Sequence, residues 1–117
     1  MEILETVKAA VKALDSKKAE DIKVIGITDL TIVADYFVIA TGNSSTQVKA
    51  LADEVEYQLG LKGVEPAHIE GKSTGWILLD YSSVVVHVFY GEQRSYYNIE
   101  KLWRDGQEMD IEKLLED

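Results

Sequence analysis

The stretch that decides the fold reads Gly75-Trp76-Ile77-Leu78-Leu79-Asp80-Tyr81-Ser82-Ser83-Val84-Val85-Val86-His87-Val88-Phe89-Tyr90. Two apolar runs, rich in β-branched and aromatic residues, flank a short polar break, which predicts a β-hairpin. Neither run alternates between apolar and polar residues, so Trp76 would point to one side of the sheet and Ile77, equally apolar, to the other. A strand that is apolar on both faces is either covered twice or presents a surface to a partner.

Length and composition describe a soluble globular chain. Its 117 residues are 46% hydrophobic and 28% charged, which predicts one domain spanning residues 1–117, with a weakly ordered acidic tail from about residue 105 to 117. No apolar run approaches the roughly 18 residues that cross a bilayer. The N-terminus has acids where a targeting peptide would have bases, so we expect a cytoplasmic protein. The absence of cysteine excludes disulfides, thiolate zinc sites and cysteine nucleophiles.

The formal net charge of −9 restricts the classes of partner. A surface this acidic repels phosphate backbones, so extensive direct binding of nucleic acid is disfavoured. The same field would steer a basic protein partner towards the chain. Acidic charge also serves solubility, so it does not identify a partner by itself.

Hydrophobic periodicity predicts elements in the order α-β-β-α-β-β-β-α. The predicted elements are a helix over residues 2–16, strands over 22–27 and 36–41, a helix over 44–60, a strand over 64–70, the hairpin, and a helix over 95–103. Ser44 and Gln47 fit a capping box, and Gly60 is placed to end the second helix. Pro66 favours an edge position for its strand, or a place at the strand's beginning. The strand over 36–41 is apolar throughout, which predicts a central position in the sheet. The fold class is therefore α/β, with a mixed sheet of about five strands and helices mainly on one face.

Counting the helices indicates that part of the hairpin stays open, since three helices can cover one face of a five-stranded sheet but hardly both. We expect some of the following side chains to remain exposed: Trp76, Leu78, Val84, Val86, Val88 and Tyr90. Trp76, at the start of a hairpin strand, is consistent with either an interface anchor or a core residue, and the helix count favours the anchor.

The patterns that would indicate catalysis are weak. The turn Thr41–Ser45 joins a strand to a helix, where anions can bind, but helix capping explains its residues better than a phosphate loop does. Nucleotidyltransferases hold magnesium with paired carboxylates, whereas Asp53 and Glu54 fall within the second predicted helix. His68 and His87 lack metal-ligand spacing. We expect no enzyme activity, metal or cofactor; a diverged nucleotidyltransferase and a small-ligand regulator using this turn are the alternatives.

Several short motifs follow one another between residues 20 and 104. They are Thr31-x-x-Ala34-Asp35-Tyr36-Phe37-Val38-Ile39-Ala40-Thr41-Gly42-x-Ser44-Ser45, Glu70-Gly71, Trp76-x-x-x-Asp80-Tyr81, Val85-Val86-His87-Val88-Phe89 and Arg94-x-x-Tyr97-x-x-Glu100-x-Leu102-Trp103. Each is weak alone, but in this order and spacing they resemble the ribosomal silencing factor, or Iojap, family.

The resemblance implies a nucleotidyltransferase-like α/β fold without metal-binding carboxylates. It also implies binding to the large ribosomal subunit through its protein fourteen, a small basic β-barrel on the intersubunit face. A factor docked there blocks subunit joining and represses translation under nutrient limitation, without a membrane partner; self-association off the ribosome is a further implication. From the hairpin geometry and the family motifs together we predict ten partner-binding residues: Glu70, Lys72, Trp76, Leu78, Asp80, Tyr81, His87, Arg94, Tyr96 and Tyr97.

The chain departs from the resemblance at the hairpin turn. Family members commonly have Asp-x-Gly-Asp there, and this chain has Asp80-Tyr81-Ser82-Ser83. Serine tolerates positive φ less well than glycine, so the turn type does not follow from the resemblance.

Overall fold

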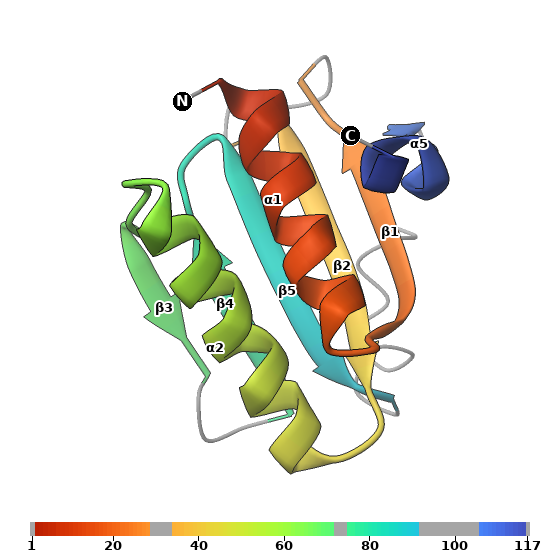
Figure 1. The fold of residues 1–117 in the computed structure, drawn as a ribbon, viewed down its shortest axis with the longest axis vertical. Helices are drawn as coiled ribbons and strands as arrows, with labels where there is room; N and C mark the ends of the chain where they lie inside the picture. The colour runs from red at the N-terminus through yellow and green to blue at the C-terminus, as the bar shows by residue number, and fades with distance from the viewer. Residues whose placement is uncertain (1, 29–33, 72–74, 92–105, 117) are drawn as a thin grey trace.

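A computed structural model describes residues 2–28, 34–71, 75–91 and 106–116 (Figure 1). The elements in chain order are α1 (Ile3–Ser16), β1 (Glu20–Gly26), β2 (Tyr36–Gly42), α2 (Ser45–Leu61), β3 (His68–Glu70), β4 (Trp76–Asp80), β5 (Val84–Tyr90), β6 (Gln107–Glu108) and α5 (Ile111–Glu116). The helix predicted over residues 95–103 lies outside the described residues.

The strands form one mixed sheet in the order β3-β4-β5-β2-β1-β6. Only β2 and β5 pair in parallel; the other neighbours are antiparallel. The α/β class, the hairpin and the central place of β2 are confirmed, and β3 lies at an edge as Pro66 indicated. The sixth strand was not predicted, because Gln107 and Glu108 carry no strand pattern and are recruited by pairing with Gly26 and Ile25.

Helices α1 and α2 pack side by side over one face of the sheet (Figure 1). Their apolar stripes meet the inward side chains of β2, β4 and β5 in the larger of two hydrophobic clusters. Helix α5 packs against α1 and β1, and its Leu114 is 4% exposed in that same cluster. Burying a leucine fully is worth about 1.5–3 kcal/mol, which contributes to holding so short a helix in place, together with the partly buried Ile111 and Leu115.

The ends of α2 follow from local hydrogen bonding. The Ser44 side chain accepts the Gln47 backbone N–H at 3.0 Å, which confirms the Ser44 half of the predicted capping box, while Gln47 Oε1 accepts the Asn43 N–H at 2.6 Å. The predicted end at Gly60 is wrong. The helix continues to Leu61, and the left-handed residue is Gly63, with φ of 80°. Gly63 N–H donates to the Gly60 carbonyl at 3.0 Å and Val64 N–H donates to the Leu59 carbonyl at 2.9 Å, which is a Schellman motif.

The second face of the sheet carries a smaller hydrophobic cluster that α1 and α2 do not cover. Its buried members are Ile25, Ile27, Ala34, Phe37, Ile39, Val85 and Phe89, and Trp76 and Leu78 pack against it while partly buried. The expectation that some of the six hairpin side chains stay open is confirmed, but none of the open ones is a valine. Val84, Val86 and Val88 belong to the helix-covered cluster, because alternate side chains of one strand point to opposite faces. Only Tyr90, Trp76 and Leu78 retain exposure.

Candidate functional site

The partly open side chains of the hairpin lie where β4 pairs with the edge strand β3. In this antiparallel pair Glu70 stands opposite Leu78, and His68 stands opposite Asp80. Residues that face each other across a ladder share one face of the sheet. We define the edge surface as His68, Glu70, Trp76, Leu78 and Asp80. Its two outer residues are exposed and its three β4 residues are half-buried, beside the second hydrophobic cluster.

Asp80 links this edge to the hairpin turn. One carboxylate oxygen accepts the Ser82 backbone N–H at 2.8 Å, and the other lies 3.6 Å from His68 Nε2. The His68 contact is an ion pair only when the imidazole is protonated. Because the two side chains are 56% and 28% exposed, solvent screens it and it contributes little stability. Asp80 therefore matters mainly as a fixed negative charge beside Leu78 and Trp76.

The turn itself places a serine in a left-handed conformation. Ser82 has φ of 69°, Ser83 N–H donates to the Tyr81 carbonyl at 2.9 Å, and Tyr81 N–H donates to the Val84 carbonyl at 2.9 Å. The backbone thus adopts positive φ at the position where family members commonly have glycine. The hydrogen bond that the Ser82 N–H donates to the Asp80 carboxylate compensates part of the strain.

Trp76 is held from beneath by buried aromatic rings. Its indole N–H donates to Nδ1 of His87 at 3.1 Å, and its ring stacks on Phe89 with centroids 5.1 Å apart and planes 24° apart. His87 is 4% exposed and makes an edge-on contact with Phe37 at 4.7 Å. Burial lowers the pKa of His87 to about 4, so the imidazole is neutral near pH 7.

Tyr81 lies on the other side of the sheet. Its side chain is 9% exposed and belongs to the helix-covered cluster, away from the edge surface. Burial, and then the negative charges of Glu56 and Glu65, raise the pKa of Tyr81 well above its usual range, so the phenol stays protonated. It is placed to support the start of the turn from within the core.

The predicted partner-binding residues thus divide into three groups. Glu70, Trp76, Leu78 and Asp80 come together on the edge surface. His87 and Tyr81 are buried, so the structure gives their side chains no surface with which to touch a partner. Four more lie outside the described residues: Lys72, Arg94, Tyr96 and Tyr97. His68 was not predicted. Its place opposite Asp80 follows from the register in which the strand after Pro66 pairs with the hairpin.

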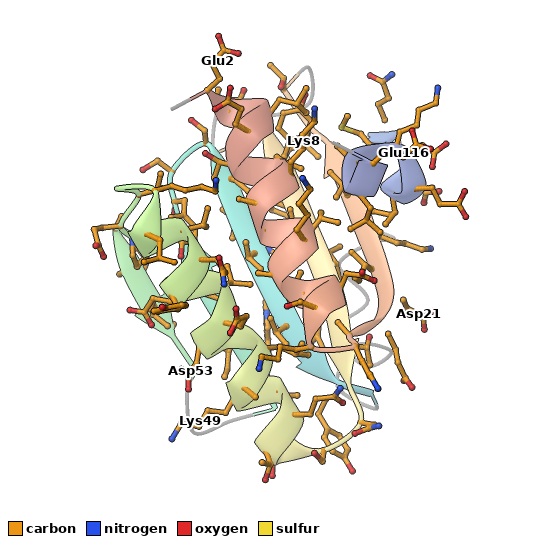
Figure 2. All side chains as sticks on the ribbon, in the orientation of Figure 1. Glu2, Lys8, Asp21, Lys49, Asp53 and Glu116 are labelled. Atoms are coloured by element: carbon orange, nitrogen blue, oxygen red, sulfur yellow. The ribbon has the colours of Figure 1, made fainter. Side chains whose placement is uncertain are left out.

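The alternatives that require a metal or an anion find no support in the described geometry. The Ser44 side chain of the Thr41–Ser45 turn is used to cap α2. Asp53 points outward from α2 (Figure 2), and Glu54 accepts a hydrogen bond from the Gln58 amide at 2.7 Å. Within residues 2–28, 34–71, 75–91 and 106–116, no three His, Cys, Asp or Glu side chains gather closely enough to hold a metal ion. Over the same ranges, every helix is too short or too polar to span a membrane.

Comparison with known proteins decides the family. The family model described as "Ribosomal silencing factor during starvation" matches residues 1–117. The chain belongs to the ribosomal silencing factor family. The ribosomal silencing factor of Bacillus subtilis is 44% identical over 106 residues, which cover 90% of each chain. The resemblance inferred from the motifs is confirmed.

The chain is also similar to a protein of known crystal structure and to a chloroplastic protein. A crystal structure of a protein from Chromobacterium violaceum superposes with a TM-score of 0.87 at 41% identity, covering 94% of this chain and 92% of that one. The chloroplastic protein Iojap of Arabidopsis thaliana is 35% identical over 91% of this chain, which corresponds to 44% of that longer protein. The mixed sheet with its helix-covered face is therefore shared with a solved structure of clear sequence similarity.

Proposed function

We propose that this chain docks on the large ribosomal subunit and blocks the small subunit from joining, which represses translation. Membership of the ribosomal silencing factor family supports a ribosome-associated silencing role. The proposed contact is the subunit's protein fourteen, a basic protein, and the proposed compartment is the cytoplasm, where the ribosomes are. The action is steric: no bond is made or broken, and no metal or cofactor takes part. Self-association off the ribosome remains part of the proposal.

The edge surface is the observation that carries this proposal. Two large apolar side chains, Trp76 and Leu78, stay half-buried while the centre of their sheet face is sealed. Two carboxylates, those of Glu70 and Asp80, flank them across the β3–β4 ladder. An apolar centre with a charged rim is the usual anatomy of a protein interface. The negative rim and the net charge of −9 suit a basic partner and would steer its approach.

The dimensions of the chain support a steric mechanism. Its principal extents are 32 × 32 × 27 Å. A rigid body of that thickness on the intersubunit face would hold two subunits apart by far more than any contact distance. The edge surface as defined by its residues is smaller than a standard interface, to which each partner contributes roughly 20–30 residues. We therefore place it at the centre of the contact and expect neighbouring residues to contribute to the rest.

Sedimentation of purified subunits tests the proposal directly. Added wild-type protein should co-sediment with large subunits and reduce the fraction of joined ribosomes. Trp76→Ala should weaken binding by about 2 kcal/mol or more if the indole is an anchor, which is about 30-fold in affinity. Tyr57→Ala is the matched control, because Tyr57 is 60% exposed on α2, which covers the opposite face of the sheet; it should leave binding unchanged.

Two results would count against the proposal. Joined ribosomes that form as readily with the wild-type protein as without it would refute the silencing mechanism. A folded Trp76→Ala protein that binds like wild type would remove the edge surface from the contact. Repeating the wild-type measurement at two salt concentrations tests the charged rim, since screening should weaken the attraction of a basic partner.

A further inference from the structure

The orientation of the Trp76 indole is fixed by a buried hydrogen bond as well as by stacking. Stacking on Phe89 sets the plane of the indole, with an angle of 24° between the rings. Stacking alone allows two orientations of the indole in that plane, related by a flip of the ring, because either face of the indole can lie on the phenyl group. The hydrogen bond to His87 Nδ1 at 3.1 Å selects one of the two orientations.

The protonation of His87 follows from this contact. An indole N–H can only donate, so the His87 Nδ1 atom must be an unprotonated acceptor, and the proton of the neutral ring is on Nε2. That Nε2 atom is buried, and no described residue accepts a hydrogen bond from it. Two stacked or edge-on rings, Phe89 and Phe37, hold the imidazole itself in place. The acceptor is therefore rigid and neutral.

We infer that His87 is a positioning residue for docking: its Nδ1 lone pair holds the Trp76 indole in the orientation that the edge surface presents to its partner. This inference rests on the proposed function. His87 would not touch the partner, since it is 4% exposed. Its effect on binding would pass through Trp76, whose free energy of contact depends on the indole being ordered before the partner arrives.

The charged groups on this face lie on strands to either side of the His87 ring. Among the described residues, the titratable side chains that strand pairing places on this face include those of Asp80 on β4, His68 and Glu70 on β3, Lys23 on β1 and Glu108 on β6. The depressed pKa of His87 is caused by burial. A proton on Nδ1 would point an N–H at the indole N–H, so the neutral tautomer is a condition for the arrangement.

Nuclear magnetic resonance of the free protein tests the positioning without the ribosome. Between pH 7.5 and 5.5, above the sequence isoelectric point of 4.6, the wild-type His87 ring should stay neutral with its proton on Nε2. The Trp76 indole N–H resonance, assigned by its loss in Trp76→Phe, should shift in His87→Phe. Its exchange with water should become roughly 3- to 10-fold faster, the worth of one net hydrogen bond. A proton on Nδ1, or an unchanged indole resonance in His87→Phe, would refute the inference.

A conservative replacement separates the acceptor from the packing. The side-chain oxygen of His87→Asn lies near the position of Nδ1 and should restore slow exchange of the indole N–H, which His87→Phe cannot do. Slow exchange in a folded His87→Phe protein would show that ring packing alone orients Trp76, against the inference. Should His87→Asn fail to fold, the tautomer measured in the wild-type protein still decides the question.

Binding to purified large subunits then tests whether positioning matters for docking. His87→Phe should weaken binding by roughly 3- to 10-fold in the wild-type background. In the Trp76→Phe background the same replacement should have less than about a twofold effect, because two residues that act as one unit are not additive. Equal losses in both backgrounds would refute the inference. If wild-type protein fails to bind at all, the proposed function fails, and the free-protein spectra still show whether His87 orients Trp76.

Discussion

The hairpin turn gives the sharpest prediction, because it holds a serine where the backbone favours glycine. Ser82 has φ of 69°. Placing an L-residue in the left-handed region costs roughly 1–2 kcal/mol of stability, and glycine avoids this cost. Glycine in turn lowers stability by roughly 0.5–1 kcal/mol, because its unfolded chain has more conformational entropy to lose. Ser82→Gly should therefore stabilise the protein by about 0.5–1 kcal/mol. The Ser82 amide keeps its 2.8 Å hydrogen bond to Asp80, so nothing else in the turn need change.

Urea unfolding at pH 7 measures this gain. With a slope of about 1–3 kcal/mol per molar urea for a small domain, the midpoint should rise by roughly 0.2–1 M without a change in slope. The adjacent Ser83→Gly is the matched control, because Ser83 is not among the described residues with positive φ. It should lower stability by roughly 0.5–1 kcal/mol through unfolded-state entropy alone. Equal shifts in the same direction for both variants would refute the assignment of strain to Ser82.

Three further outcomes are expected. Lys18 has φ of 62° just beyond α1, in hydrogen bonds like those of Gly63 beyond α2, so Lys18→Gly should raise the urea midpoint by an amount similar to Ser82→Gly. Leu114→Ala should destabilise the fold by about 2–4 kcal/mol, or less if α5 simply detaches, whereas exposed Glu116→Ala should not. The pKa of His87 falls from 6.5 to about 4 on folding, so the unfolded chain binds a proton that the folded chain refuses below pH 6.5. Stability should fall from pH 7 to 5.5 by about 1 kcal/mol more in wild type than in His87→Phe, as followed by urea unfolding; equal falls would contradict the assignment.

Sequence patterns predicted the fold correctly where the local signal and the burial of the residues agree. The hairpin, the central strand at residues 36–42 and the Ser44 cap of α2 are confirmed, because each has a strong pattern within a few residues. In α2 the left-handed glycine was misplaced by three residues, because it is Gly63 and not Gly60, while the helix itself ends one residue after Gly60, at Leu61. The apolar stripe continues to Leu59 and a half-buried Val64 follows, so Gly63 supplies the left-handed turn. β6 could not be predicted, since it exists only by pairing with β1.

The sequence predicted several residues of the candidate site, but not which face of the sheet each predicted residue occupies. Trp76, Leu78 and Asp80 share one strand and one face, which their alternate spacing already implies. The error lay in treating the hairpin as one surface, although Val86 points to the helices while His87 points to the other side. Burial of a face depends on what folds over it, and no local pattern records that. His68 joined the site only through the register of two strands.

The position of the edge surface follows from how the sheet shares its apolar side chains. The strands at the centre, β2 and β5, are buried on both faces except at their ends, Tyr36 and Tyr90, so their middle residues offer no side chain to a partner. Exposure returns towards both edges of the sheet. It returns at β1 and β6 on one side, and on the other side at β4, whose successive residues alternate between half-buried and buried, and at the three-residue edge strand β3. We place the partner at the β3–β4 edge, because Glu70 and Asp80 stand there beside the half-buried Leu78. A phosphate backbone would be repelled there, whereas a basic protein would be attracted. If this chain recognises the ribosome by this surface, the negative charge there favours contact with a basic ribosomal protein over contact with RNA.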